Sequence, residues 1–273
     1  SIASLLPVWL LLQPRDFINS HQLVVGLGLL FLGIFVAAPV VDAPAIRLES
    51  EGAPPIFPML FVTIACGAIS GFHGLVSSGT TSKQVNKLQD ARFIGYGGMI
   101  GEGVLALAST LAAVAGIALV SQCNLPSIGA VENLSWAVYY DSWAHATANK
   151  ATAFVLGGAA LIEQLGFSHS LAKTLMAVLV ISFAATTLDS ATRIQRFIIS
   201  EIGSATQINM LTNKYTATAL AVIPATILAL WSVPDPITSE LKKAGWVLWP
   251  IFGASNQMLA ALTLMILTLY FYH

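Results

Sequence analysis

Glycine, histidine, serine and threonine are concentrated in "ISGFHGLVSSGTTSKQ", residues 69–84, at the end of a run without formal charge from Ile56 to Ser82. Glycine lowers helix propensity, and hydroxyl side chains compete for the backbone hydrogen bonds of a helix. Broken backbone at membrane depth offers free N–H and C=O groups to a substrate or an ion. The segment therefore predicts a substrate-binding break that includes Ser70, Gly71, His73, Gly74, Ser77, Ser78 and Thr80. The alternative is the frayed cytoplasmic end of an ordinary helix, with Lys83 at the interface.

A second polar group lies in "ATTLDSATRIQR", residues 185–196, within an apolar stretch. A carboxylate at the edge of the hydrocarbon layer is costly and is a functional candidate by default. Oxygen atoms of carboxylates, hydroxyls and carbonyls are the ligands that hard cations such as Na⁺ take. We therefore expect an ion-coupling patch formed by Thr186, Thr187, Asp189 and Ser190. The alternative is a structural ion pair between Asp189 and Arg193, four residues apart on one helix face.

Glu102 is the only charged residue in the apolar run 93–120. Gly97 and Gly101 form a G-x-x-x-G pattern, which lets two membrane helices approach closely. We expect such an approach to bury Glu102, and burial favours the protonated form of a carboxyl group. Glu102 is therefore a candidate proton carrier, although it could equally serve as a hydrogen-bond partner for a neighbouring helix end.

Asn256 and Gln257 lie in "FGASNQMLAAL", residues 252–262, where an apolar helix interior would not favour amides. Hydrogen bonding between membrane helices is the role expected for them. The two cysteines, Cys66 and Cys123, lie far apart and outside any metal-ligand spacing. We therefore expect no metal site and no cofactor; the candidate coupling ions are Na⁺ and H⁺.

The composition excludes an ordinary soluble domain. Only 9% of the 273 residues are charged and 56% are hydrophobic, with a mean hydropathy of +0.78, whereas soluble domains carry about 25% charged residues. The net charge of −1 gives no reason to expect a nucleic-acid partner. The lipid bilayer is the expected surrounding.

The apolar runs predict an all-α, polytopic membrane helix bundle, because about 20 apolar residues cross a bilayer as a helix. Seven spans are expected, at residues 1–13 (the second half of a truncated span), 22–41, 56–82, 93–120, 171–192, 215–233 and 245–272. The segment 151–162 is too short to cross and predicts a re-entrant or surface-lying helix, and 121–150 predicts a loop with an amphipathic helix. The basic residues of 83–92 favour a cytoplasmic position for that loop, which places Lys173 on the outer side.

Since residues 1–13 resemble half a span, we interpret residues 1–273 as a single membrane domain, the C-terminal part of a larger transporter. Its N-terminal helices would then lie on the same chain or on a separate one.

Four segments together have a familiar pattern: "ACGAISGFHGLVSSGTTSKQ" (65–84), "DARFIGYGGMIGEG" (90–103), "TTLDSATRIQRF" (186–197) and "WPIFGASNQMLAAL" (249–262). In this order they resemble the carbon starvation protein A (CstA) family. The resemblance implies a multi-pass transporter of the bacterial inner membrane, in the amino acid–polyamine–organocation superfamily, with a leucine-transporter-like fold. Residues 56–82 would then be the sixth core helix, one of two broken ones, and 171–192 the eighth.

The resulting functional hypothesis is a secondary active transporter, not an enzyme. It would import a small carboxylate such as pyruvate, or peptides, during nutrient starvation, driven by a cation gradient. The alternative is a membrane-anchor subunit of a respiratory enzyme. Such a subunit usually carries pairs of histidines within its helices for haem, and here only His73 lies inside a predicted span.

Overall fold

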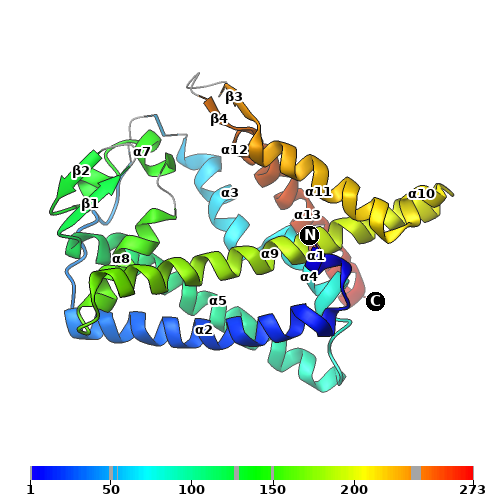
Figure 1. Cartoon of the computed structure of the whole chain (residues 1–273), viewed down its shortest axis with the longest axis horizontal. Helices are drawn as coiled ribbons and strands as arrows, with labels where there is room; N and C mark the ends of the chain where they lie inside the picture. The colour runs from blue at the N-terminus through cyan, green and yellow to red at the C-terminus, as the bar shows by residue number, and fades with distance from the viewer. Residues whose placement is uncertain are drawn as a thin grey trace. The chain divides into compact units, whose positions relative to one another are not determined.

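The computed structural model describes residues 2–48, 52–53, 55–125, 129–148, 151–234 and 241–272 of the chain. These residues are mostly helical (Figure 1). The chain forms two compact units. The first contains Ser1–Gln13, Pro55–Leu88 and Thr186–His273, and the second contains Pro14–Pro54 and Gln89–Ala185. Two long helices, α2 (Val8–Ala37) and α9 (His169–Ala205), each contribute residues to both units.

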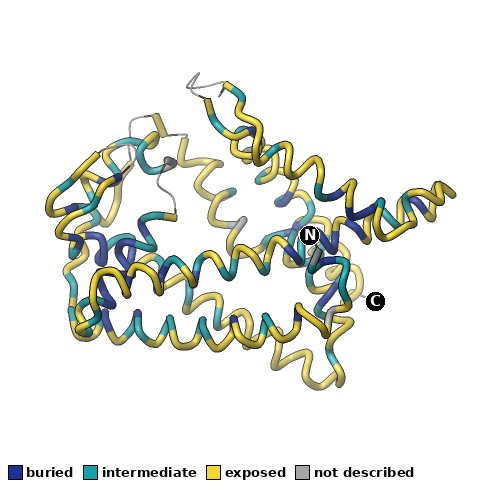
Figure 2. The backbone as a smooth tube through the Cα atoms, in the orientation of Figure 1, coloured by how far each residue is buried: buried dark blue, intermediate teal, exposed yellow. Residues whose placement is uncertain are grey.

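The second unit is built around a short helix, α8 (Thr152–Glu163), of which eight of the twelve residues are buried. It packs on the end of α5 (Leu88–Val114) and on the 3₁₀-helix η2 (Gly116–Leu119). Glycines allow this contact, because a Cβ at Gly157 would overlap the carbonyl oxygen of Ala112. Figure 2 shows the buried residues gathered in this region. Residues 151–162 thus form a helix too short to cross a bilayer, as expected, and it is buried within the unit because its Gly and Ala residues let neighbouring backbones close over it.

Two hydrophobic clusters form the core of this unit. One joins α2, α5, α8 and α9 through Leu30, Ala112, Leu161 and Met176, among others. The other lies under the connecting segment 121–148 and includes Ile117, Leu125, Leu134 and the fully buried Tyr139.

The connecting segment contains more than the predicted amphipathic helix. Strands β1 (Gln122–Leu125) and β2 (Gly129–Glu132) pair antiparallel, with Gln122 opposite Glu132, and are followed by the short helices α6 (Trp136–Tyr139) and α7 (Trp143–Ala148). A second hairpin, β3 (Ser232–Pro234) with β4 (Leu241–Lys243), belongs to the first unit. The expectation of an all-α chain thus needs a correction, confined to two small hairpins between helices.

The first unit is a set of interrupted helices. Short α1 (Ile2–Leu5) precedes the start of α2, and α3 (Ile56–Ala68) is followed by α4 (Gly71–Val76) and the π-helix η1 (Ser77–Thr81). After α9 come α10 (Asn209–Thr212), α11 (Lys214–Leu230), α12 (Ala244–Val247) and α13 (Trp249–Tyr272).

Among the described residues, four helices are long and apolar enough to cross a membrane: Trp9–Ala37, Leu88–Val114, His169–Ala205 and Ile251–Tyr272. Their surfaces are exposed along most of their length (Figure 2), as lipid-facing helices would be. Four of the seven predicted spans have another form. Residues 1–13 and 22–41 largely merge into α2, the 56–82 span is broken, and α11 has only 17 residues around Pro224.

The polar stretch inside α2 explains the merger. Residues 14–21 were expected to be a loop, but Pro14 is accommodated within the helix. The hydroxyl of Ser20 donates a hydrogen bond to the carbonyl oxygen of Phe17 at 2.8 Å, and His21 Nδ1 lies 2.8 Å from the same oxygen. Because these polar side chains bond to their own helix, the helix continues through them.

Candidate functional site

The helix break lies at Ile69 and Ser70, between α3 and α4. Ser70 has extended backbone angles (φ −78°, ψ 135°) and its Oγ accepts a hydrogen bond from the backbone N–H of Phe72 at 3.2 Å. This is the usual geometry of a serine N-cap. The break is shorter than the 70–80 expected from the sequence, because Gly71–Thr81 is helical in α4 and η1.

Asn256 of α13 completes the cap from another helix. Its Oδ1 accepts a hydrogen bond from the N–H of Phe72 at 2.9 Å, and its amide lies 3.0–3.1 Å from the hydroxyl of Ser70. Gln257 reaches the other side of the break, since its Nε2 donates to the carbonyl oxygen of Val62 in α3 at 3.2 Å. Adjacent amides of α13 thus attach both halves of the broken helix.

Gly71 and Gly74 are contact points between α4 and α13. A Cβ at Gly71 would overlap the carbonyl oxygen of Asn256 and lie 2.7 Å from Cβ of Leu259. A Cβ at Gly74 would lie 2.9 Å from Oγ1 of Thr263. The sequence suggested that these glycines line a substrate site; the structure places them against a neighbouring helix.

The remaining predicted substrate residues divide by exposure. His73, Ser77 and Ser78 are exposed, and both serine hydroxyls donate to the carbonyl oxygen of Gly74, at 3.0 and 2.9 Å. Thr80 is buried in η1, and its Oγ1 has no hydrogen-bond partner in the described part of the chain. A π-helix of this kind is frequently found at functional sites.

Segment η1 lies beside the second predicted cluster on α9. A Cβ at Gly79 would be 3.8 Å from Cγ1 of Ile194, and Nζ of Lys83 lies 5.4 Å from the ring centroid of Phe197. The structure therefore brings the break segment and the polar end of α9 together in the first unit.

The predicted ion-coupling residues do not form one buried patch. Asp189 is buried, Thr186 and Ser190 are half-buried, and Thr187 is exposed. Oδ2 of Asp189 lies 3.8 Å from Nη2 of Arg193, and both side chains are about 95% buried, at 5% and 4% exposure. Among the described residues no group of three or more His, Cys, Asp or Glu side chains could hold a metal ion. This geometry favours the structural ion pair over a cation site.

Two buried arginines of α9 hold the interrupted N-terminal helix, a role that the sequence did not suggest. Arg193 donates from Nη1 to the carbonyl oxygen of Leu6 at 3.1 Å and from Nη2 to that of Ala3 at 3.2 Å, and Arg196 donates to Ser4 at 2.7 Å. In a continuous helix the carbonyl oxygen of Ala3 would accept a hydrogen bond from the N–H of residue 7. Pro7 has no N–H, so that donor is missing. The available signal was two arginines three residues apart in an apolar helix.

Glu102 is exposed, and the expectation that it is buried is wrong. A Cβ at Gly97 or Gly101 would have nothing within 4 Å. No other described helix of the second unit therefore packs closely on this glycine face of α5. It belongs to the second unit, whereas the break and the end of α9 belong to the first.

A separate polar cluster orders the connecting segment of the second unit. Asp42 accepts a hydrogen bond from the N–H of Trp136 at 2.6 Å, and Arg47 donates to the carbonyl oxygens of Tyr140 and Asp141. Burial acts to raise the pKa of Asp141, but hydrogen bonds from His145 and Ser142 outweigh it and lower that pKa. These contacts stabilise the loop and form no convergent site.

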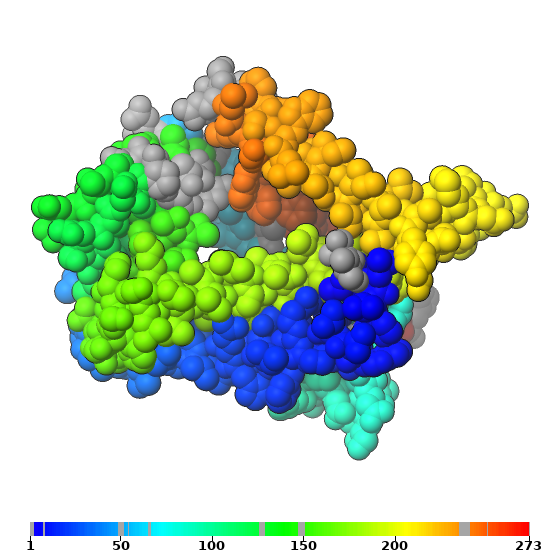
Figure 3. All heavy atoms as spheres, viewed as in Figure 1, coloured from blue at the N-terminus to red at the C-terminus, as the bar shows by residue number. Residues whose placement is uncertain are grey.

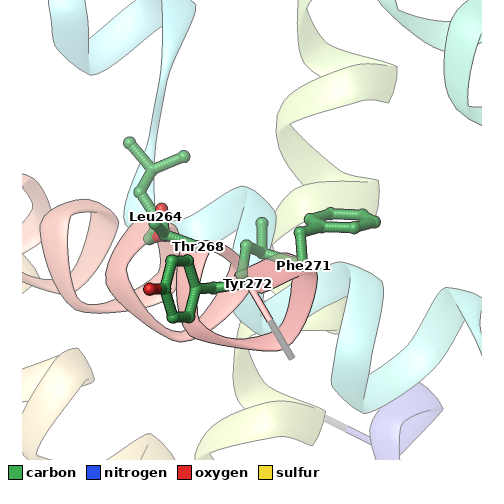
Figure 4. Close-up of a pocket in the computed structure, with 5 residues that line it drawn as sticks. Leu264, Thr268, Phe271 and Tyr272 are labelled. Carbon is green, nitrogen blue, oxygen red and sulfur yellow. The ribbon is translucent and has the colours of Figure 1, made fainter.

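A hollow of about 440 Å³ lies beside the end of α13 (Figure 4). The residues that line it all come from this one helix: Leu264, Leu267, Thr268, Phe271 and Tyr272. A mostly apolar surface of this kind suits lipid chains rather than a polar substrate.

The fold and the site define a helical membrane protein in which an apolar helix is broken and capped by the side chains of another helix. The chain belongs to the carbon starvation protein CstA family, whose model matches residues 1–273. It is 32% identical to the peptide transporter CstA of Mycobacterium tuberculosis, over 97% of this chain and 40% of that protein.

Two Escherichia coli proteins show similar relationships. The chain is 32% identical to the peptide transporter CstA, over 97% of this chain and 43% of that protein. It is 34% identical to the pyruvate/proton symporter BtsT, over 97% of this chain and 44% of that protein. The chain thus spans less than half the length of each of these relatives, all of which are named as transporters rather than enzymes. No solved structure matches the chain significantly.

Proposed function

We propose that this chain forms part of a secondary transporter of the bacterial inner membrane that imports a small carboxylate or peptides. The observation that carries the proposal is the break at Ser70, in a helix that is otherwise apolar and is held open by Asn256. Such breaks place backbone groups at membrane depth, where transporters bind substrates and ions. Family membership and the names of the relatives support the same function.

The coupling ion that we propose is the proton. One relative is named as a pyruvate/proton symporter. Asp189 is buried 3.8 Å from the guanidinium of Arg193, an arrangement that supports a structural role for it. Glu102, exposed on a candidate span, is the better candidate.

The proposed architecture is the C-terminal part of a leucine-transporter-like domain, with 56–82 as a broken core helix. Helices that correspond to the rest of the relatives' length would complete the substrate site from the other side. The exposed glycine face around Gly97 and Gly101 would be available for packing against them.

Uptake in cells that make the complete transporter tests the function. We expect labelled pyruvate or an alanine tripeptide to accumulate, a protonophore to abolish accumulation, and replacement of sodium by choline at a fixed pH gradient to leave it unchanged. Loss of uptake in choline would instead identify sodium as the coupling ion. Absence of accumulation for both substrates would reject the proposed substrate classes.

A further inference from the structure

A pocket of other residues, distant from the helix break in sequence, lies in the second unit. It has a volume of about 220 Å³ and lies between β1, the start of α8 and the start of α9. Figure 3 shows this face, where the green atoms of the β1 region adjoin the yellow-green atoms of α8 and α9. Six of its lining residues can hydrogen-bond or carry charge: Gln122, Cys123, Asn124, Thr152, His169 and Lys173.

The charge in this pocket comes from Lys173. Lys173 is exposed, and it makes no hydrogen bond or ion pair with the residues that the structure describes. His169 lies four residues earlier on α9. Its Nδ1 is 2.8 Å from Oε1 of Glu163, so the carboxylate of Glu163 pairs with the imidazole of His169. Among the described residues, the ammonium group of Lys173 at this pocket therefore has no carboxylate partner.

The effect of Lys173 reaches across the pocket to β1. Burial raises the pKa of the Cys123 thiol, and the nearby ammonium of Lys173 opposes that rise. Cys123 is half-buried and free of any disulfide. The thiol therefore lies within the field of the lysine and can report on the charge inside the pocket.

Amide and hydroxyl groups supply the other polar surface. Gln122 and Asn124 come from β1, and Thr152 begins α8. The hydroxyl of the buried Tyr139 bonds to the backbone of Ala153 and to Thr152, which fixes the start of α8 at the wall of the pocket. The helix N-terminus adds positive potential to that of Lys173.

We propose that this pocket binds a small organic carboxylate, with Lys173 as its charge partner and the first turn of α8, at Thr152, beside it. On the orientation predicted from the basic residues, it lies on the outer side of the membrane. Its role as a first binding site for the transported carboxylate rests on the proposed function; the binding itself does not.

Reaction rates at Cys123 test the pocket in membrane vesicles that contain the complete protein. Peptide mass spectrometry measures the modification of Cys123 separately from that of Cys66. Each rate is divided by the rate of the same reagent with a small free thiol, because a thiolate itself favours the cationic reagent. On this normalised scale we expect an anionic methanethiosulfonate reagent to react about tenfold faster than its trimethylammonium counterpart, because a cationic pocket concentrates anions. The ratio of the two rates cancels any change in the thiolate fraction. Lys173→Gln should bring the ratio close to one, whereas Lys87→Gln, an exposed lysine of the other unit, should not.

Ligand protection supplies the second measurement. Lactate should slow the labelling of Cys123, neutral lactamide should not, and Lys173→Gln should remove the protection by lactate. Equal normalised rates for the two reagents in the unsubstituted protein, or equal protection by lactate and lactamide, would overturn the inference. Since neither readout requires transport, a failure here is distinguishable from a failure of uptake.

Discussion

The backbone N–H of Phe72 has its hydrogen-bond acceptors in the side chains of Ser70 and Asn256, because α3 ends at Ala68 and α4 begins anew at Gly71. A buried N–H left without an acceptor destabilises a protein by about 1–3 kcal/mol. The amide of Asn256 is 5% exposed, so water does not readily replace it. At the residue scale, Asn256 supplies the acceptor from α13 that stabilises the first turn of α4 together with Ser70.

Asn256→Leu should therefore lower the free energy of unfolding by about 1–3 kcal/mol and abolish uptake. Asn256→Asp keeps an acceptor for the N–H of Phe72 and should retain part of the stability and part of the uptake. Thermal unfolding in detergent and substrate uptake measure the two effects. The control is Ser255→Ala, because the exposed Ser255 bonds only to carbonyls of its own helix. Equal behaviour of Asn256→Leu and Ser255→Ala would contradict this account.

Arg193 neutralises a buried carboxylate and binds two backbone carbonyls of the N-terminal segment. Breaking a buried ion pair by removing one partner typically costs about 3–5 kcal/mol. Arg193→Met should destabilise the protein by that order, and Asp189→Asn added to it should recover part of the loss. A double-mutant cycle on unfolding free energies measures the coupling. Strictly additive effects would show that the two side chains do not stabilise each other.

At the scale of elements, the contact between α4 and α13 depends on the absence of a side chain at Gly71. A methyl group there would overlap the backbone of Asn256. Gly71→Ala should therefore lower thermal stability as well as uptake. Gly67→Ala, at a position with nothing within 4 Å, should be neutral or slightly stabilising. A Gly71→Ala protein with normal stability and no uptake would instead support a substrate-lining role for Gly71.

The sequence predicted a break and hydrogen bonds between helices at Asn256 and Gln257, but not the position of the break or the groups to which those amides bond. Hydroxyl and glycine residues from 70 to 81 all weaken a helix, yet Gly71–Val76 stays helical because it packs on α13. The arginines of α9 were equally hidden, because their partners are backbone carbonyls about 190 residues away, and backbone groups leave no mark in a sequence. Periodicity and composition report local preference, whereas these contacts are tertiary.

The predicted helix boundaries differ from the observed ones for a related reason. The polar residues between the first two predicted spans resembled a loop, but they satisfy their hydrogen bonds within α2. The length of 151–162 could be read from the sequence. Its burial inside the unit depends on contacts with distant residues, which one segment does not reveal. The candidate spans at α5, α9 and α13 agree with expectation, because the length of an apolar run is sufficient to predict a membrane-spanning helix there.

At the scale of the whole molecule, proton coupling joins a titratable group to substrate movement. Glu102→Gln resembles the protonated side chain and should leave unfolding unchanged, because the residue is exposed. Uptake should lose its dependence on the pH gradient. Glu201→Gln, an exposed glutamate at the far end of α9, is the control. If uptake by Glu102→Gln keeps the pH dependence of the unsubstituted protein, another group carries the proton.

The cap on α4 also imposes an order on biosynthesis. Asn256 follows Phe72 by 184 residues, so at ribosomal speeds of about 5–20 residues per second it is added roughly 10–40 s later. Throughout that interval the nascent chain presents an incomplete helix end to the membrane insertion machinery and to quality-control proteases. A chain released before α13 should therefore be degraded faster than one that ends after Asn256, and pulse-chase labelling of the two would reveal it. The cap on α4 is therefore completed only after α13 has been synthesised.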